Sequence, residues 1–199
     1  MTRWSRIRLC SAMMVLIASL ASACDSRSGG GPLTTLLSGG QPVFAVAAIS
    51  TLPGQAADMT ASGSNSAPGQ VTLVSATLMP VAGQPAGRLS HVAVGTLRGY
   101  VAAARGRPPG VTVRPLPGAV LPQGQSNIIF GFAGNHDGGV YITTGLKVVY
   151  RYHGQIFTVD ALSAAANCVV KTLHTPFPFP RCEQGRIRAD RAAKALAGR

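Results

Sequence analysis

The sequence is poor in acidic residues, with 6 Asp and Glu against 18 Lys and Arg in 199 residues. Only Asp137 and Asp160 fall between Gln70 and Val170, and no local pair of carboxylates could serve as the acid and base of a glycoside hydrolase. The motifs GxSxG and GxxxxGK(S/T) are also missing, so the local signatures of a serine-hydrolase elbow and a phosphate-binding loop are absent. We therefore expect a protein that is not an enzyme and has no cofactor.

Long apolar runs are also missing. After Arg3, Arg6 and Arg8, the 15 residues from Leu9 to Ala23 carry no charge. As a helix they would reach about 22 Å, which is less than the ~30 Å core of a bilayer. A basic start, a short apolar run and a small-residue exit at Ala21–Ala23 are typical of a secretory signal. We expect residues 1–23 to be a signal peptide and the protein to be exported.

Cysteines are few, and their number is informative. Cys10 would leave with the signal, so the exported chain keeps Cys24, Cys168 and Cys182. Residues 20–24, LASAC, resemble the lipobox of bacterial lipoproteins, in which the cysteine is diacylated and becomes the new N-terminus; Ala21 departs from that pattern. Lipidation of Cys24 would leave Cys168 and Cys182 to form a disulfide. Ordinary cleavage after Ala23, giving a secreted protein, and a retained signal anchor are the alternatives.

Composition divides the exported chain into parts. Residues 24–69 are predicted to be a tether and low-complexity linker, with a Gly-rich start, an apolar stretch at 32–49, and small polar residues with Gly and Pro at 53–69. Residues 70–170 alternate strand-like runs with turn signals and show no sustained 3.6-residue period. This pattern predicts one domain, an all-β, immunoglobulin-like antiparallel β-sandwich. The N-terminal segment before it is expected to be disordered or helical.

Residues 171–199 are predicted to form a loop closed by the disulfide, followed by a short basic tail. The loop contains Pro176–Pro180, whose three prolines force an extended path. Phe177 and Phe179 would project to one side of this path and could contact a partner protein, or they could pack on the sandwich. The tail from Arg186 is expected to form a frayed helix.

One hairpin can be predicted residue by residue. If His153–Gly154 is a two-residue turn, Tyr150 faces Phe157 on an apolar side of the hairpin. On the other side Lys147 then faces Asp160, an opposite-charge pair. A slip of one residue would scramble both sides, so the register is well specified.

Histidine and methionine raise the possibility of a metal. His136 and His153 both fall at predicted turns, where a copper site could open, although their spacing matches no known His/Met motif. Most turn histidines are only solvated, so we expect no metal and keep an exported copper-binding domain as an alternative function.

Basic charge indicates the kind of partner. Without its signal the chain keeps 15 Lys and Arg against 6 acids, a formal charge of +9. An exported protein with this charge is expected to meet anionic lipid headgroups or acidic wall polymers rather than nucleic acid.

Residues 70–168 resemble the small immunoglobulin-like domains of uncharacterised exported proteins from GC-rich Gram-positive bacteria. The resemblance lies in PLPGAVLPQGQSNIIFGFAG and GGVYITTGLKVVYRYHGQIFTV, and it implies a fold without catalytic residues. We therefore expect a non-catalytic lipoprotein at the outer face of the cytoplasmic membrane, acting as a binding or scaffolding module. An accessory subunit of a cell-wall enzyme is a further alternative.

Overall fold

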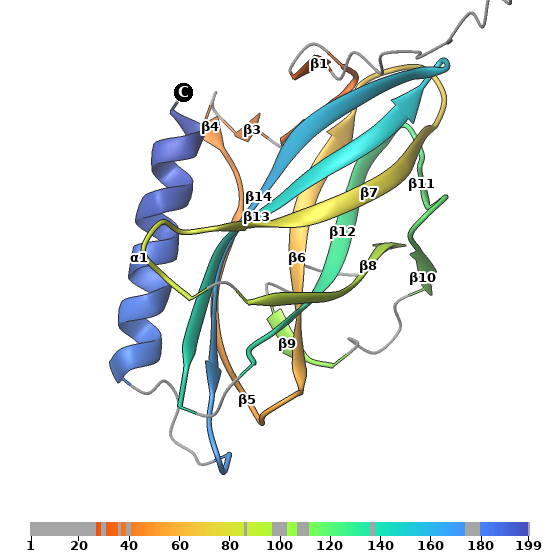
Figure 1. Ribbon diagram of the computed structural model, residues 1–199. Helices are drawn as coiled ribbons and strands as arrows, with labels where there is room; N and C mark the ends of the chain where they lie inside the picture. Colours follow the sequence, from red (N-terminus) through yellow and green to blue (C-terminus); the bar gives the residue numbers. More distant parts are fainter. Residues whose placement is uncertain are drawn as a thin grey trace, which may run out of the picture.

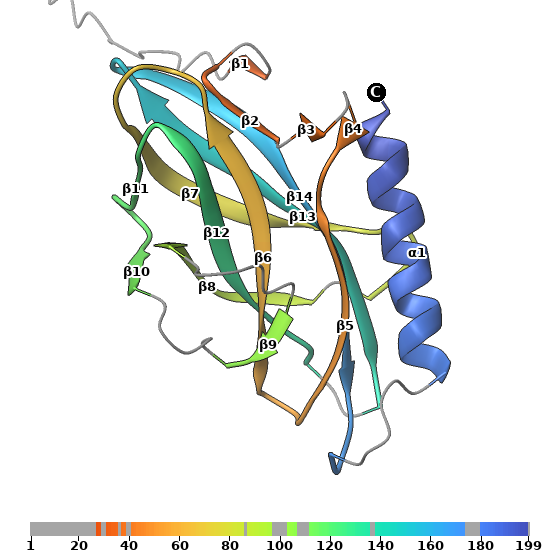
Figure 2. The ribbon, with the colours of Figure 1, turned by 180° about the vertical axis from the view of Figure 1, so that it is seen from behind.

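The computed structural model describes residues 27–28, 31–35, 37–38, 41–85, 87–96, 103–106, 112–135, 138–173 and 180–198. This part of the chain forms two six-stranded β-sheets, a small two-stranded sheet and one C-terminal helix (Figure 1, Figure 2). The prediction of a mostly β fold built from two sheets is confirmed. In chain order the elements are β1 (Arg27–Ser28), β2 (Leu33–Thr35), β3 (Leu37–Ser38), β4 (Gln41–Pro42), β5 (Ala45–Thr51), β6 (Ala56–Asn65), β7 (Val71–Pro80), β8 (Arg88–Thr96), β9 (Ala103–Arg105), β10 (Thr112–Pro115), β11 (Val120–Leu121), β12 (Gly124–Ala133), β13 (Val140–Tyr152), β14 (Gln155–Val169) and α1 (Pro180–Ala197).

The first sheet, called here the β13 sheet, has the order β1-β14-β13-β7-β11, and β5 also pairs with β14. The predicted hairpin register is confirmed, because Tyr150 pairs with Phe157 and Lys147 with Asp160. His153 and Gly154 have φ angles of 46° and 78°, the two positive values that a type I′ turn requires. The prediction of purely antiparallel sheets is wrong at one edge, since β1 and β5 both run parallel to β14.

The second sheet, called here the β12 sheet, has the order β10-β8-β12-β6-β2, and β9 also pairs with β6. β12 lies between β8 and β6, so the run SNIIFGF is the central strand that its alternation predicts. Ile128, Phe130 and Phe132 are buried on its inner side.

The interpretation of residues 53–69 as a linker is wrong. β6 pairs with β12 along all ten of its residues. Ala57 and Met59 point into the core, and the intervening Asp58 and Thr60 are also buried. Small side chains bury little area each, but pairing on both edges satisfies the strand backbone, and small residues allow close packing. The folded unit therefore begins well before residue 70.

The two sheets share one apolar core. The β13 sheet contributes Leu73, Val148 and Tyr150, and the β12 sheet contributes Met59 and Phe130, all of them buried. These side chains alternate along their strands with residues of the opposite face, as period-2 patterning requires. The core therefore explains why apolar alternation predicted β7, β12 and β13 correctly, whereas β6, which carries Met59, was missed.

A polar link joins the two sheets inside the protein. Asn167 of β14 is fully buried, and its Nδ2 donates to the carbonyl oxygen of Phe132 in β12 at 2.8 Å. The hydroxyl of Thr51 in β5 donates to Asn167 Oδ1, also at 2.8 Å. A buried amide with such partners avoids the cost of an unpaired polar group and fixes how three strands meet.

The N-terminal segment docks on the β13–β14 hairpin. The Leu33 amide donates to Tyr150 Oη at 3.2 Å, and burial raises the pKa of the Tyr150 hydroxyl. A Cβ on Gly31 would lie 2.1 Å from Tyr150 Oη and 2.8 Å from the Phe157 ring, so a side chain at this position would force these rings to move. Residues 31–35 are thus part of the sandwich, and the prediction of a tether over all of residues 24–69 is wrong.

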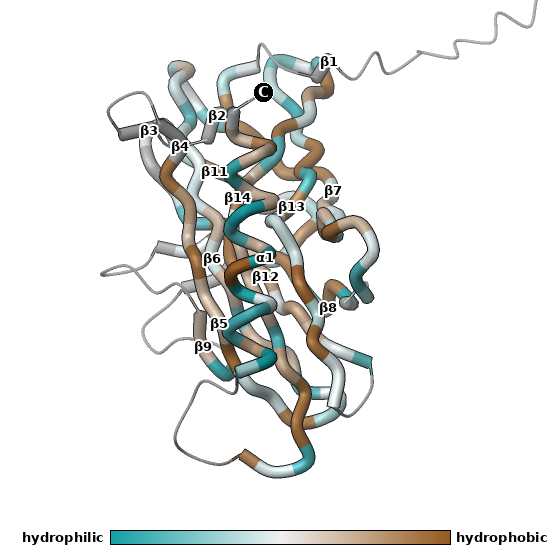
Figure 3. The backbone as a smooth tube through the Cα atoms, turned by 90° about the vertical axis from the view of Figure 1, so that its left-hand side faces the viewer, coloured by the Kyte–Doolittle hydropathy of each residue, from teal (hydrophilic) through white to brown (hydrophobic). Residues whose placement is uncertain are grey.

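The helix α1 forms a third layer on the outer side of the β13 sheet, against β5, β13 and β14 (Figure 1, Figure 3). Its buried side is made of small residues, Gly185, Ala189 and Ala193. A Cβ on Gly185 would lie 2.7 Å from Val140, so glycine allows the helix to approach the strands closely. The helix starts at Pro180, earlier than the predicted Arg186, because proline is well suited to a first helical turn.

Candidate functional site

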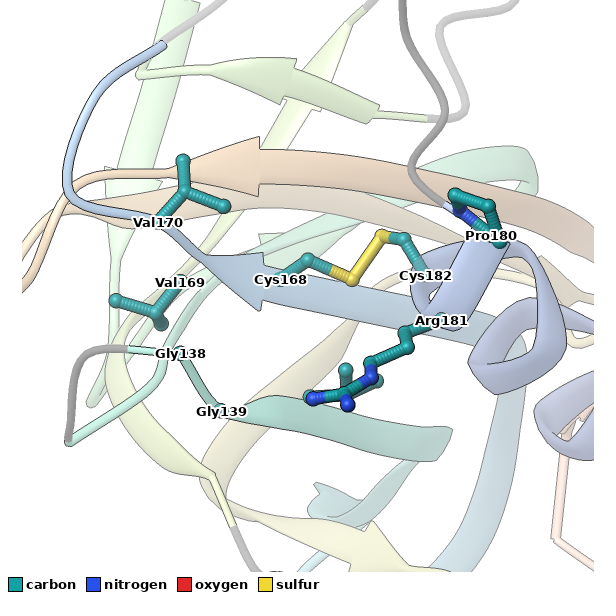
Figure 4. A pocket seen from close by; sticks show the side chains of 9 residues that line it. Gly138, Gly139, Cys168, Val169, Val170, Pro180, Arg181 and Cys182 are labelled. Atoms are coloured by element: carbon teal, nitrogen blue, oxygen red, sulfur yellow. A yellow bond between two sulfur atoms is a disulfide. The ribbon is translucent and has the colours of Figure 1, made fainter.

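The predicted disulfide is confirmed, since Cys168 and Cys182 are joined with their Cα atoms 5.7 Å apart. It ties the end of β14 to the first turn of α1 (Figure 4). The lipidation residue Cys24 and the possible partner contacts Phe177 and Phe179 lie outside the described residues.

A pocket of about 400 Å³ lies beside this disulfide. Its walls are mostly apolar, with Val140, Val169, Val170 and Pro180 among them. Arg181 extends from the first turn of α1 toward the start of β13 and places one cation at the rim (Figure 4). The pocket is suited to an apolar group that carries a negative charge.

The candidate copper ligands that the structure describes do not lie close to one another. His153 is exposed at the hairpin turn, where its ring packs edge-on against Tyr152 with centroids 4.1 Å apart. Met59 and Met79, the two methionines that follow the predicted signal, are buried, and His136 lies outside the described residues. Within the described part of the chain, no three His, Cys, Asp or Glu residues gather in a way that could hold a metal.

A polar constellation that the sequence does not reveal crosses the β12 sheet. Gly131 on the central strand β12 pairs with Asp58 of β6 on one side and with His91 of β8 on the other. His91 Nε2 lies 3.0 Å from Asp58 Oδ1, so the imidazole reaches across the strand between them. The two atoms approach closely, but their geometry is not that of an aligned hydrogen bond.

Glycine is required at the centre of this row. A Cβ at Gly131 would lie 2.3 Å from the Nδ1 and Cε1 atoms of His91 and 2.1 Å from Ser90 Oγ. Any other residue would occupy the place of the imidazole ring. The missing side chain therefore creates the space in which His91 and Asp58 meet.

A β-bulge brings Ser90 to the same place. His91 pairs with Gly131, but Leu89 pairs with Phe132, so Ser90 is an extra residue on β8. In a regular strand Ser90 and His91 would point to opposite faces. Here Ser90 Oγ lies 3.1 Å from His91 Nδ1, and the two side chains act on the same side of the sheet.

The surroundings favour one arrangement of protons. Asp58 is 3% exposed and His91 is 42% exposed, so a nearly buried carboxylate lies behind a half-open imidazole. A carboxylate beside Nε2 favours the proton on that nitrogen, which leaves Nδ1 as the acceptor for the Ser90 hydroxyl. The order of groups is hydroxyl, base and carboxylate.

A groove of about 330 Å³ opens in front of Ser90 and His91. Besides these two residues it is lined by β7, by neighbouring residues of β8, and by the turn after β10. The lining residues are Val74, Ser75, Ala76, Leu89, Val92, Leu116 and Pro117. Most of them are apolar, and those that the structure describes include no Lys, Arg, Asp or Glu.

Sequence reasoning missed this site because its parts are far apart in the chain. Asp58 falls in the stretch interpreted as a linker, although the alternation ADMTAS carries the period of a strand. The expectation of no catalysis rested on finding no nucleophile, base and orienting carboxylate together. The structure changes that premise, because it places Ser90 beside His91 and His91 beside Asp58.

Comparison with protein-family models, with curated proteins and with solved structures finds no match for this chain. The described residues contain no helix with the length and apolarity needed to cross a membrane.

Proposed function

We propose that this protein is an exported lipoprotein, held at the outer face of the cytoplasmic membrane by diacylated Cys24, and that its sandwich works as a binding module. The observation that carries the proposal is the Cys168–Cys182 disulfide. It leaves Cys24 as the one unpaired cysteine after removal of residues 1–23. A single thiol at the end of a secretory signal is the residue that lipoprotein processing modifies.

The start of the fold supports an anchor close to the sandwich. β1 begins at Arg27 and pairs with β14 beside the tip of the β13–β14 hairpin. Arg27 comes three positions after Cys24, a span of at most about 11 Å. An acylated Cys24 would therefore hold the end of the molecule that carries β1 near the lipid headgroups (Figure 1).

The charge of α1 supports an anionic partner. Arg186 pairs with Glu183, and Lys194 pairs with Asp190 at 2.8 Å. Arg181, Arg188 and Arg191 are exposed, and no ion pair involves them within the described residues. Three unneutralised guanidinium groups on one helix suit anionic headgroups or acidic wall polymers, since arginine binds phosphate and carboxylate in a bidentate manner.

The finer assignment of the sandwich as immunoglobulin-like is also part of this proposal. It is supported by the size of the domain and by two sheets that share one core. The third layer formed by α1 would be an addition to that fold.

The experiment is metabolic labelling with a fatty acid, followed by mass spectrometry of the mature N-terminus. We expect a label on the wild-type protein, a diacylated Cys24 at the first position, and loss of the label in Cys24→Ser. Cys10→Ser is the matched control, because Cys10 lies within the signal and its loss should leave the label unchanged. A mature chain that begins at Cys24 without an acyl group would end the proposal.

A further inference from the structure

We propose that Ser90 is a nucleophile, that His91 is its general base, and that Asp58 positions the imidazole, so that the site takes an acyl group from a carboxylic ester. The inference goes beyond the binding role proposed above and does not depend on the lipid anchor. Its observations are the three-strand row, the bulge at Ser90 and the groove in front of it.

The distances meet the requirements of general-base catalysis. A base must lie about 2.6–3.2 Å from the atom whose proton it takes, and His91 Nδ1 lies 3.1 Å from Ser90 Oγ. The base needs a group that orients it, and Asp58 Oδ1 lies 3.0 Å from His91 Nε2. The alignment of that last contact can improve when an ester fills the groove, as is common between free and occupied sites.

The construction of the site is specific rather than incidental. A nearly buried carboxylate such as Asp58 is costly without a partner. Its approach to His91 depends on a glycine at position 131 and on one inserted residue, Ser90. Neither feature is needed for strand pairing alone, since Gly131 lies inside a ten-residue strand, two residues before its end, where glycine weakens the sheet.

The groove indicates the class of ester. Its apolar walls come from Val74, Ala76, Leu89, Val92, Leu116 and Pro117. A volume of about 330 Å³ is near the lower end for small-molecule sites and accommodates a short acyl chain. We therefore expect an uncharged, short-chain carboxylic ester.

The chemistry balances without any further reactant except water. Ser90 Oγ attacks the acyl carbon and forms a new ester bond, while its proton passes to His91 Nδ1. The proton then leaves with the alkoxide group as an alcohol when the original ester bond breaks. Water attacks the acyl-Ser90 ester, with His91 again taking and returning the proton, and a carboxylic acid is released.

The test uses the purified full-length protein and two activated probes, a tagged fluorophosphonate and p-nitrophenyl butyrate. We expect a covalent adduct of the fluorophosphonate, mapped to Ser90 by peptide mass spectrometry, and release of p-nitrophenol. Ser90→Ala should abolish both signals. His91→Gln should lower the labelling rate by about 10²–10⁴, the usual contribution of a general base. Ser66→Ala is the matched control, because Ser66 is an exposed serine that does not line the groove, and labelling of this variant should be unchanged.

Asp58 acts through His91, so its test needs a separate readout. Asp58→Asn should lower the labelling rate and also change the ¹⁵N chemical shifts of the His91 ring, because the carboxylate that favours the Nε2 proton is gone. The proposal is overturned if no adduct forms on Ser90, if the adduct maps to Ser75, or if His91→Gln reacts as fast as the wild type. If His91→Gln fails to fold, the comparison of Ser90→Ala with Ser66→Ala decides the question, since the Ser90 side chain is exposed and its removal leaves no cavity. An acyl label at Cys24 and an adduct at Ser90 are separate measurements, so either proposal can fail alone.

Discussion

Replacing Gly131 with Ala should separate His91 from Asp58 and destabilise the protein. The new Cβ would lie 2.3 Å from the imidazole, and ordinary contacts begin at 3.4 Å, so the ring must retreat by about 1.1 Å. That movement takes Nε2 away from the carboxylate oxygen that it now approaches to 3.0 Å. Asp58, which is 3% exposed and has a further partner, would then lose the imidazole that now lies beside its Oδ1 atom.

The magnitude follows from the burial of the two groups. Removing one partner from a fully buried ion pair costs about 3–5 kcal/mol. His91 is 42% exposed, so water partly replaces it, and a cost of about 1–3 kcal/mol is expected instead. The lower backbone entropy of Ala in the unfolded chain offsets at most about 1 kcal/mol of this.

Urea denaturation followed by circular dichroism measures this loss at neutral pH. The matched control is the same substitution made in the Asp58→Asn variant, which has no carboxylate beside His91. There Gly131→Ala should lower the free energy of unfolding by less than it does in the wild type. Equal stability of Gly131→Ala and wild type, or the same cost in both backgrounds, would show that the row across the three strands is not coupled in the way we describe.

Two other predictions concern the frame of the fold. Tyr150→Phe should cost about 1 kcal/mol at neutral pH, because the buried Leu33 amide loses its acceptor. Burial raises the pKa of Tyr150, so above pH ~10 the unfolded chain loses the phenol proton while the folded protein still holds it. The free energy of unfolding of the wild type therefore falls as pH rises above ~10. The stability gap between wild type and Tyr150→Phe should therefore narrow in alkaline denaturation curves, and a constant gap up to pH 11 would contradict the burial argument. Replacing both Cys168 and Cys182 with Ser should lower the free energy of unfolding by about 3 kcal/mol, as measured by thermal denaturation, and make it insensitive to reductant. A wild-type protein whose melting does not respond to reductant would speak against that estimate.

The elements predicted correctly from the sequence are those whose signals are local. The β13–β14 hairpin combines a two-residue turn, apolar alternation and the Lys147–Asp160 pair, whose atoms lie 2.9 Å apart. Each of these signals independently selects one register. The disulfide could also be predicted, because the number of cysteines in the exported chain left few ways to pair them.

β6 was missed because composition and periodicity disagree there. Residues 56–65 are small and polar, which is typical of a linker, yet they alternate with the period of a strand. Their burial depends on β12, a strand about 60 residues further along the chain, and no local signal reports that partner. The site shares this difficulty, since Asp58, Ser90 and Gly131 meet only through the pairing of three strands and through a bulge that one inserted residue creates.

The last strand of the sandwich determines when the protein can finish folding. β14 receives β1 and β5 along one edge, β13 along the other, and α1 on its face. Two of these partners belong to the first 51 residues, and they cannot pair until their partner residues in β14 are present, 157–158 for β1 and 163–169 for β5. During synthesis from the N-terminus, β1 and β5 therefore remain unpaired until β14 is present. Their pairing with β14 closes large loops and is expected to be slow. We therefore expect the protein to complete its folding after the whole chain is present, and not while the chain is still being made.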